Sequence, residues 1–463
     1  MANASLSSSK GGTMKSASPT DAFAPLRAFL RQIRRRIVLL TLLRLPRADR
    51  REREFWATGW GWYRRPSAKG GVWIHASTIG EVRIALSVIQ SLPAELPLVI
   101  TTFDVESAVA AERLLRGRAA VTAFPAPFRF AMRRFVEHFD PRRLIIIETQ
   151  FYPLIVLAAV RPNLPAAVVS MFNDQQQIEL FLPLLRSVEL FGVRLEEDRR
   201  KLVEHGIPIA RIGVTGDLKF DALALEPRRD LEVALRGLAG DRPILIAGST
   251  HPEEEPAVLD AFEQLGGGRR ALLLLAPRVP TLGKSEALLR QRGIDYRKRT
   301  KLPVKGRPAV VLLDSIGELP SLYRLAAAAF VGGSMMLGGG GHSPLEAARS
   351  AVPVAVGPNM SNFRLIAEIF DRAGAWTRVT NADDLARAWT TWLDNPEAAQ
   401  TLGKCAAELV QAHQGALTRT LDLLQTFLGQ SDALGPAVKT PATRLRWPQA
   451  PVIEGLRPPA AIP

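Results

Sequence analysis

Two successive series of short apolar runs, separated by helix-length segments, constrain the fold of this chain more than any other feature. The first series reads "GVWIHAS", "LPLVITTF", "AAVTAFP", "RRLIIIETQ", "PAAVVSM", "SVELFGV" and "IGVTGDLKF". The second reads "PILIAGS", "ALLLLAPR", "AVVLLDS", "AAAFVGGS" and "PVAVGP". Runs that are apolar along almost their whole length are typical of parallel strands buried on both faces of a sheet. The sequence therefore predicts an α/β fold of two Rossmann-like, doubly wound parallel-sheet lobes that face a ligand-binding cleft.

The charged segment 224–243 separates the two series and is predicted to connect the lobes. A length of 463 residues favours two or three domains, at roughly 150 residues per domain. The predicted organisation is a disordered segment (1–24), a basic amphipathic helix region (25–60), a first lobe (61–226), a second lobe (227–432) and a Pro-rich disordered tail (433–463).

The charge balance points to anionic partners. Sixty Lys and Arg residues against 45 Asp and Glu give a formal charge of +15, which suits nucleotides, phosphorylated substrates, acidic membrane or nucleic acid without choosing among them. A hydrophobic content of 47% indicates a globular chain with a large core. The single cysteine, Cys405, excludes an intrachain disulfide and a cysteine metal cluster, which favours cytosolic chemistry.

The segment "LRAFLRQIRRRIVLLTLLRLPRADRRERE" places arginines around a short apolar run. That run, Ile37 to Leu43, has seven residues against the roughly 20 that span a bilayer, so neither a membrane span nor a signal peptide is expected. Two interpretations stay open: a helix lying on an anionic membrane surface, or a first core helix with a solvated basic face. Nucleic-acid binding is the weakest interpretation, because no nucleic-acid motif follows.

Two glutamates of the first lobe end apolar runs, where open α/β sheets carry their working residues. Glu81, in "VWIHASTIGEV", is a candidate base for a substrate hydroxyl, although a carboxylate in a first helical turn also has a purely structural use. Glu148, in "LIIIETQFYP", either contacts substrate or pairs with an arginine such as Arg83 or Arg129.

The second lobe offers anion-binding groups at its strand ends. In "LIAGSTHPEEE", Ser249 and Thr250 present hydroxyls and backbone N–H groups to an anion, or Thr250 caps the following helix. Arg278 ends "LLLLAPR" as a natural phosphate clamp. The run "GGSMMLGGGGHSPLEAA", residues 332–348, is interpreted as a loop that enters a helix near Pro344, because its glycines let backbone approach a ligand.

The order of nine segments resembles the 3-deoxy-D-manno-octulosonic acid (Kdo) transferase family over residues 72–370. These segments are "HASTIGEV", "ETQFYP", "VTGDLKFD", "AGSTHPEEE", "LAPR", "IGELPSLY", "FVGGS", "GGHSPLE" and "VGPNMSNFRLIAE". The resemblance implies a GT-B glycosyltransferase that transfers Kdo from CMP-Kdo onto a lipid A precursor (lipid IVA) at the cytoplasmic face of the bacterial inner membrane. The implied partners are therefore CMP-Kdo, a phosphorylated glycolipid acceptor and an anionic membrane surface, and no nucleic acid.

The resemblance also implies roles for residues that match its motifs. Glu81 is the general base of an inverting transfer, and Glu148 matches a second family glutamate. Arg278 is expected near the CMP phosphate and Glu346 at the ribose hydroxyls, which a carboxylate can accept from. The full expected donor site is Arg278, Ile316, Gly317, Glu318, Leu319, Ser343, Glu346, Ser249, Thr250 and Asn362. No metal or cofactor is implied, because arginine and backbone N–H groups can neutralise a single phosphate.

The resemblance assigns the acceptor to the first lobe (61–226) and the CMP-sugar donor to the second (227–432). Several segments depart from the family pattern, mostly in this acceptor lobe. They are residues 101–107, residues 170–177, Gln150 to Tyr152 before Pro153, and Ser343 in place of an asparagine. These departures leave two alternatives open: a CMP-ulosonic acid transferase with a different glycolipid or polysaccharide acceptor, and a noncatalytic protein that binds a CMP-sugar.

Overall fold

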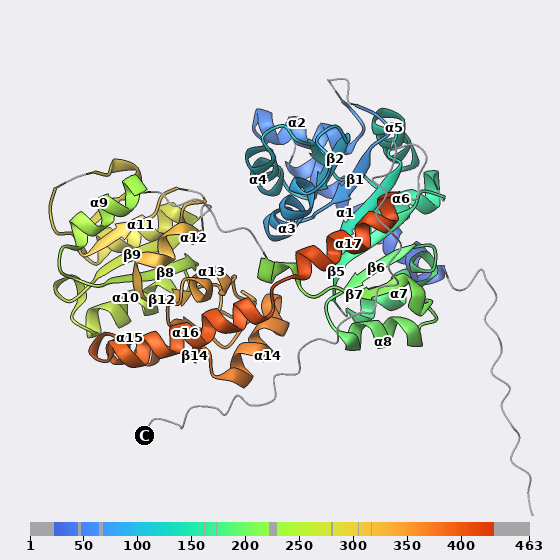
Figure 1. Ribbon diagram of the computed structural model, residues 1–463. Helices are drawn as coiled ribbons and strands as arrows, with labels where there is room; N and C mark the ends of the chain where they lie inside the picture. The colour runs from blue at the N-terminus through green and yellow to red at the C-terminus, as the bar shows by residue number, and fades with distance from the viewer. Residues whose placement is uncertain are drawn as a thin grey trace, which may run out of the picture. The chain divides into compact units, whose positions relative to one another are not determined.

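The computed structural model describes residues 23–44, 48–63, 68–161, 163–172, 174–221, 229–278, 281–303, 305–315 and 317–429. They divide into two compact units (Figure 1). Unit 1 contains the described residues up to Leu218 and those from Gly415 onward, and unit 2 contains those of Lys219–Gln414. The predicted tail 433–463, and all but the last two residues of the predicted segment 1–24, lie outside the described residues.

Unit 1 is built on a seven-stranded parallel sheet with the strand order β3-β2-β1-β4-β5-β6-β7. Its strands are β1 (Val72–His75), β2 (Leu98–Thr102), β3 (Ala120–Ala123), β4 (Arg143–Ile147), β5 (Ala166–Met171), β6 (Leu190–Val193) and β7 (Ile212–Val214). The order runs outward in both directions from β1 and β4, so the carboxyl ends of these two strands meet at the switch point where open α/β sheets bind ligands.

Helices cover both faces of this sheet, because successive strand residues point to opposite sides. Trp73 packs with α5 (Arg129–Phe139), α6 (Pro153–Val160) and α7 (Gln175–Leu185) on one face. Ile74 packs on the other face with α3 (Ile79–Gln90) and α4 (Val105–Leu115). The remaining helices of the unit are α1 (Ala24–Arg44), α2 (Arg50–Gly59), α8 (Glu196–Glu204) and α17 (Ala416–Gly429).

Helix α17 belongs to unit 1, whereas the sequence assigned it to the second lobe of 227–432. Its buried residues Ala416, Leu424 and Phe427 join the core on the α3 face, and α17 contacts α3, β5 and β6 (Figure 1). An apolar helical stripe shows that a helix is buried but not which sheet buries it. The sequence therefore assigned α17 to the wrong lobe. The predicted 226/227 boundary falls within 222–228, outside the described residues.

Unit 2 repeats the architecture with the strand order β10-β11-β9-β8-β12-β13-β14. Its strands are β8 (Ile244–Thr250), β9 (Leu272–Pro277), β10 (Tyr296–Lys298), β11 (Val310–Leu312), β12 (Ala326–Val331), β13 (Val354–Val356) and β14 (Thr377–Arg378). Its helices are α9 (Arg229–Ala239), α10 (Glu255–Gln264), α11 (Leu282–Gln291), α12 (Leu319–Leu322), α13 (Leu345–Arg349), α14 (Arg364–Ala373), α15 (Ala382–Asp394) and α16 (Pro396–Ala412).

The predicted fold class, two Rossmann-like parallel-sheet lobes of the GT-B type, is confirmed. The five strands predicted for the second lobe are its central ones. The two strands that were missed, β10 and β14, lie at the sheet edges and consist of "YRK" and "TR". Edge strands are half exposed and carry no continuous apolar run, so the criterion that found the others does not detect them.

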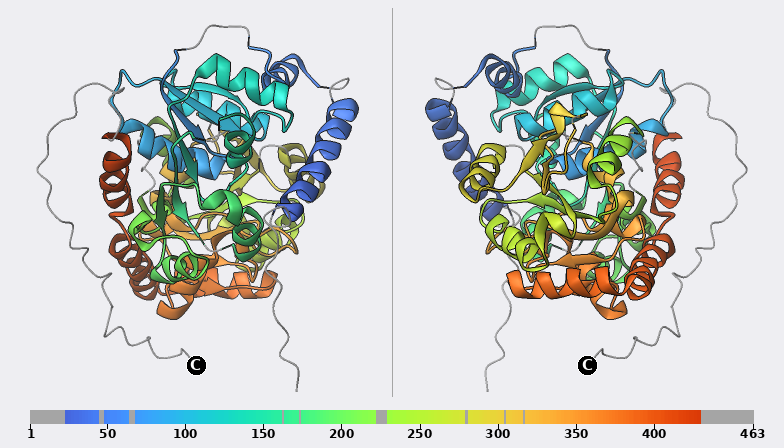
Figure 2. Two further views of the ribbon diagram at one scale, coloured as in Figure 1. Left: turned by 90° about the vertical axis from the view of Figure 1, so that its right-hand side faces the viewer. Right: turned by 90° about the vertical axis from the view of Figure 1, so that its left-hand side faces the viewer.

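The two halves of helix α1 differ in burial. In its first half Leu26 is buried, and the ring of Phe29 lies 5.9 Å from Tyr152 and 5.8 Å from Phe181 between centroids. In its second half the side chains of Val38, Leu39 and Leu43 are exposed. Figure 2 shows the blue amino-terminal helices on the outside of unit 1. None of the helices in the described residues is long and apolar enough to cross a membrane.

Candidate functional site

Glu81 lies in the first turn of α3, directly after the carboxyl end of β1. Its carboxylate folds back on the start of the helix: Oε2 accepts from the backbone N–H of Ser77 at 2.6 Å, and Oε1 accepts from the Thr78 hydroxyl at 3.2 Å. The Thr78 hydroxyl in turn accepts from the N–H of Glu81 at 3.3 Å. Thr78 is thus the N-cap of α3, and the Glu81 side chain reaches back to the backbone N–H of Ser77, one residue before the cap. Only 4% of Glu81 is exposed.

A buried polar chain leads from the sheet core to Glu81. Trp73 Nε1 donates to the Thr101 hydroxyl at 2.9 Å, and His75 Nδ1 lies 2.8 Å from the same oxygen. His75 Nε2 lies 3.0 Å from the Ser77 hydroxyl, and the Ser77 N–H donates to Glu81. Complete burial lowers the pKa of His75 to about 3, so this imidazole is neutral near pH 7.

Glu148, at the carboxyl end of β4, pairs with Arg194, an arginine that the sequence analysis did not name as its partner. Arg194 Nη2 lies 2.5 Å from Glu148 Oε1, and its Nη1 lies 3.1 Å from Asp217 Oδ2. All three side chains are almost completely buried. Burial alone lowers the pKa of Arg194, but the carboxylates of Asp217 and Glu148 raise it above its ordinary value. Arg194 therefore stays charged.

Two residues around Arg194 adopt left-handed backbone conformations that non-glycine residues rarely adopt. Glu148 has a φ of 61° and Ser170 a φ of 54°. Arg194 Nε donates to the Ser170 carbonyl at 3.0 Å, and the guanidinium lies 4.7 Å from the Phe172 ring. Strain of this kind persists where the surrounding structure over-determines a conformation, which is common at functional sites. The ion pairs of Arg194 thus fix the chain after β4 and β7, and its hydrogen bond and ring contact fix the end of β5.

Sequence reasoning missed Arg194 and Asp217, although a signal for both was present. Arg194 ends the apolar run "SVELFGV", and Asp217 follows the last strand of the unit. The criterion that selected Glu148, a charge that terminates a buried strand, also selects Arg194. His75 gave no comparable signal, because it continues β1.

In unit 2, Ser249 and Thr250 lie at the carboxyl end of β8, as predicted. Thr250 is fully buried, and its hydroxyl donates to Glu255 Oε1 at 2.9 Å. It is therefore not the cap of α10, whose N-cap residue is Glu254. Ser249 has a φ of 57° and is partly exposed.

Glu254 holds two loops together at this edge of the sheet. Its Oε1 accepts from the N–H of His251 at 3.1 Å and from the N–H of Gly333 at 2.5 Å, and its Oε2 accepts from the N–H of Met335 at 3.2 Å. Burial raises the pKa of Glu254, and these backbone donors partly offset the effect. The loop after β8 and the glycine-rich loop after β12 are thereby joined.

The glycine-rich segment 332–344 is the predicted loop between β12 and α13. A Cβ on Gly332 would lie 2.5 Å from Glu254 Oε1, and one on Gly333 would lie 2.8 Å from the His342 ring. A Cβ on Gly340 would lie 2.4 Å from Asn362 Nδ2. The bare backbone therefore lets this loop pack against its neighbours, which excludes a slack linker.

The polar residues predicted around this loop support its geometry. Ser343 Oγ donates to Glu346 Oε2 at 2.5 Å, so the residue that replaces the family asparagine holds Glu346 in place. The N–H of Asn362 donates to the Gly340 carbonyl at 2.9 Å. Burial is the main cause that raises the pKa of Tyr323, and the charge of Glu346 adds to it.

The predicted segment 316–319 begins α12. Gly317 has a φ of 84°, which favours glycine, and Leu319 is the first residue of the helix. Glu318 accepts two hydrogen bonds from the Arg299 guanidinium, both of 2.7 Å. Glu318 is thus committed to an ion pair with a residue that gave no sequence signal. Ile316 lies outside the described residues.

Arg278 follows β9 and lies beside two histidines that the prediction did not include. His251 follows β8, His342 belongs to the glycine-rich loop after β12, and β9, β8 and β12 are neighbours in the sheet. The Nε2 atoms of the two histidines lie 2.9 Å apart. Burial lowers the pKa of both rings, and the charge of Arg278 lowers it further, to about 4 for His342.

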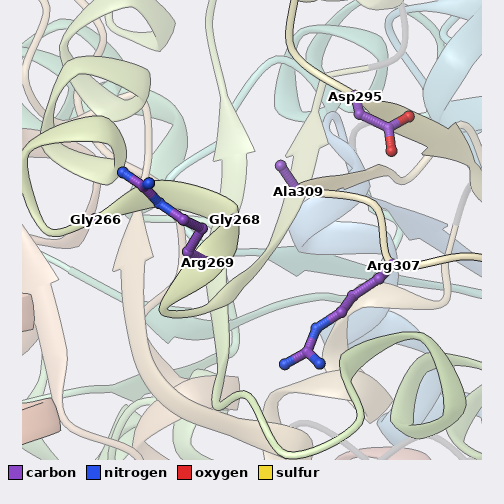
Figure 3. Close-up of a pocket in the computed structure, with 6 residues that line it drawn as sticks. All are labelled: Gly266, Gly268, Arg269, Asp295, Arg307 and Ala309. Carbon is purple, nitrogen blue, oxygen red and sulfur yellow. The ribbon is translucent and has the colours of Figure 1, made fainter.

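A separate hollow lies at the opposite, amino-terminal edge of the unit 2 sheet (Figure 3). It is lined by Gly266, Gly268, Arg269, Asp295, Arg307 and Ala309. Arg307 forms an ion pair with Asp241, and Arg297 pairs with Asp295 at 2.5 Å. None of the predicted site residues borders this hollow.

Comparisons with known proteins place the chain in a family. Residues 54–222 match the sequence profile of 3-deoxy-D-manno-octulosonic-acid transferase (kdotransferase). The 3-deoxy-D-manno-octulosonic acid transferase of Bordetella pertussis is 31% identical over 77% of this chain and 87% of its own length. That of Haemophilus influenzae is 29% identical over 82% of this chain and 92% of its own length.

Among solved structures, the UDP-GlcNAc 2-epimerase of Neisseria meningitidis has a TM-score of 0.52, with 14% identity over 77% of this chain and 100% of its own. At that identity the likeness concerns the fold alone. The sequence relatives, and the collinear motifs that the structure places at the carboxyl edges of both sheets, show that the chain belongs to the 3-deoxy-D-manno-octulosonic acid transferase family of glycosyltransferases.

Proposed function

We propose that this chain transfers Kdo from CMP-Kdo to a phosphorylated lipid A precursor, lipid IVA, in an inverting reaction with Glu81 as the general base. An acceptor hydroxyl oxygen bonds to the anomeric carbon of Kdo while the bond from that carbon to the CMP phosphate breaks. The hydroxyl proton passes to Glu81, and the electron pair of the broken bond leaves with CMP. The scheme belongs to lipopolysaccharide core biosynthesis.

The observation that carries this proposal is the placement of Glu81. It lies next to the switch point of the unit 1 sheet, at the amino end of α3, with two hydrogen bonds to its carboxylate and a fixed geometry. A carboxylate held in one position is already oriented for the proton that it accepts, which is the condition for efficient general-base catalysis. In this scheme Glu148, held by Arg194, supports the adjoining loops of the acceptor lobe.

The donor side of the proposal rests on unit 2. Arg278, the backbone of the glycine-rich loop and the Gly317–Leu319 turn belong to the carboxyl edge of its sheet, where nucleotide ligands bind in open α/β folds. Within the described part of the chain, the Arg278 side chain forms no ion pair, so its charge is available to the CMP phosphate. Glu346 is proposed to bind the ribose hydroxyls.

A membrane-surface location is part of the proposal, because a glycolipid acceptor resides there. Helix α1 exposes Val38, Leu39 and Leu43 beside several arginines. Arg34 Nε donates to the Pro127 carbonyl at 2.6 Å, which ties α1 to an aromatic cluster. The cluster consists of Trp60, Trp62, Phe128 and Phe130. Exposed apolar and aromatic side chains flanked by arginines suit the headgroup region of an anionic leaflet.

A comparison of acceptors tests the proposal. Purified protein is incubated with CMP-Kdo and with lipid IVA, dephosphorylated lipid IVA or a polysaccharide primer, and CMP release and Kdo-bearing product are measured. We expect a Kdo-lipid product with lipid IVA and much less without its phosphates. Turnover with the polysaccharide primer alone would instead support a different acceptor. CMP binding without turnover on any acceptor would contradict the proposed activity and support a noncatalytic protein.

A further inference from the structure

The contact between His251 and His342 is a hydrogen bond that only one proton can occupy. The two Nε2 atoms lie 2.9 Å apart and the ring planes differ by 8°. One Nε2 must therefore carry a hydrogen and the other must accept it. A second proton between the same two atoms would break the bond, so the pair titrates as a unit.

The neutral pair has one outer Nδ1 with a hydrogen and one without. When the pair gains a single proton, both Nδ1 atoms carry hydrogens and the bond between the rings survives. No hydrogen bond within the described residues engages either Nδ1. Gaining one proton thus increases the number of Nδ1–H donors of the pair from one to two. It also adds one positive charge beside Arg278.

In the absence of a bound anion, the groups around the His251–His342 pair disfavour its protonation. Burial is the main cause that lowers the pKa of both rings, and the charge of Arg278, after β9, lowers it further, as His251 does for His342. Glu253 acts in the opposite direction on His251. Glu254 is oriented to the backbone N–H groups of His251 and Gly333 and holds the pair's two loops together. The pair is therefore held in place by its two loops, and burial together with Arg278 keeps it neutral against the opposing effect of Glu253 on His251.

We propose that binding of an anionic nucleotide at the carboxyl edge of the unit 2 sheet is coupled to the uptake of one proton by the His251–His342 pair. A phosphate that neutralises Arg278 removes the repulsion that disfavours the charged pair and supplies an acceptor for its hydrogens. The inference rests on the proposed CMP-sugar donor, and it adds a regulation of that site: donor affinity increases as pH falls. An affinity coupled to one proton changes by up to about tenfold per pH unit.

Calorimetric titration with CMP tests the coupling. The protein is titrated between pH 6 and pH 8 in buffers of different ionisation enthalpy, and the number of protons taken up per CMP is derived. His342→Asn removes the pair, and His413→Asn is the matched control, since His413 stacks on Phe220 elsewhere in unit 2. The CMP phosphate itself titrates at about pH 6 and contributes to the measured proton number. The coupling is therefore read from the difference in proton number between the wild type and His342→Asn.

We expect the wild type and His413→Asn to take up about one more proton per CMP than His342→Asn below pH 7. Cytidine, which lacks the phosphate, should show no such difference, and inorganic phosphate alone should reproduce it if the anion is sufficient. Equal proton numbers in the wild type and His342→Asn would overturn the inference and leave the proposed donor intact. No binding of CMP would instead contradict the proposed donor.

Histidine ring resonances of the wild-type protein provide a second measurement that needs no variant. The chain has six histidines, so their titration curves can be followed individually with and without CMP. The inference predicts that CMP shifts the titration of one ring of this pair to higher pH. Unchanged titration of every histidine in the presence of bound CMP would overturn it.

Discussion

Arg194 donates to Glu148 at 2.5 Å, and both side chains are buried in unit 1, where Asp217 completes a triad of charges. Removing the arginine takes the Arg194 charge away from two buried carboxylates, and breaking a buried pair in this way costs about 3–5 kcal/mol. We therefore expect Arg194→Met to lower the free energy of unfolding of unit 1 by that amount in urea titrations. Arg199→Ala, which breaks the exposed pair with Glu196, should cost at most about 1 kcal/mol. Equal losses would contradict a structural role for the triad.

The glycine-rich loop offers a matched pair of substitutions. Gly333 and Gly338 both have a left-handed backbone, with φ values of 68° and 79°, so alanine costs each about 1–2 kcal/mol of backbone strain. A Cβ on Gly333 would lie 2.8 Å from the His342 ring, whereas a Cβ on Gly338 meets no atom within 4 Å. We expect Gly333→Ala to weaken CMP binding at least tenfold in calorimetry and Gly338→Ala to leave it close to wild type. Equal affinities would show that the loop does not shape the donor site.

Membrane binding should depend on the exposed half of α1. Leu39→Glu replaces a side chain that is 56% exposed, and we expect it to reduce cosedimentation with vesicles that contain phosphatidylglycerol. Ile209→Glu is the control, since Ile209 is 59% exposed in another part of unit 1. Binding should also fall with added salt, because each arginine near an anionic surface contributes about 1 kcal/mol. Equal binding of the two variants would argue against α1 as the contact.

The buried His75 makes the stability of unit 1 dependent on pH. Its pKa is about 3 in the folded state because of burial, against about 6.5 in an unfolded chain. Between these values the unfolded chain binds a proton that the folded state does not, so stability falls as pH falls, by up to about 1.4 kcal/mol per pH unit. His75→Gln should show a shallower loss between pH 6.5 and pH 4.5 in urea unfolding. An identical slope would contradict a neutral buried His75.

The buried parts of the fold could be predicted because a strand covered on both faces must be apolar along its length. β1, β4 and β8 are of this kind. The edge strand β10 is not, and α17 has an apolar stripe that either sheet could bury. Local sequence does not encode which of two similar surfaces covers a helix, so the assignment of α17 required the structure.

The candidate site could be located from the sequence more easily than its pairings. Charges at strand ends identified Glu81, Glu148 and Arg278, because a charge stops a buried run only where the chain leaves the core. The partners of these residues come from distant segments: Arg194 is 46 positions from Glu148, and His342 is 91 positions from His251. Such pairs depend on the order of the strands in the sheet, which no local pattern determines.

The two uses of Glu81 that the sequence could not separate are both compatible with its geometry. The Ser77 N–H needs a side-chain oxygen at position 81, which glutamine also supplies, whereas a general base needs a carboxylate. Glu81→Gln therefore keeps an acceptor for the Ser77 N–H and removes the base. Glu106→Gln is the matched control, because Glu106 is an exposed first-turn carboxylate of the neighbouring helix α4.

The most direct measurement is the rate of Kdo transfer from CMP-Kdo to lipid IVA by the wild type and these two variants. Glu81→Gln should lower the rate about 10²–10⁴-fold, with thermal stability and CMP affinity unchanged, and Glu106→Gln should match the wild type. A Glu81→Gln variant that retains wild-type turnover would contradict Glu81 as the base.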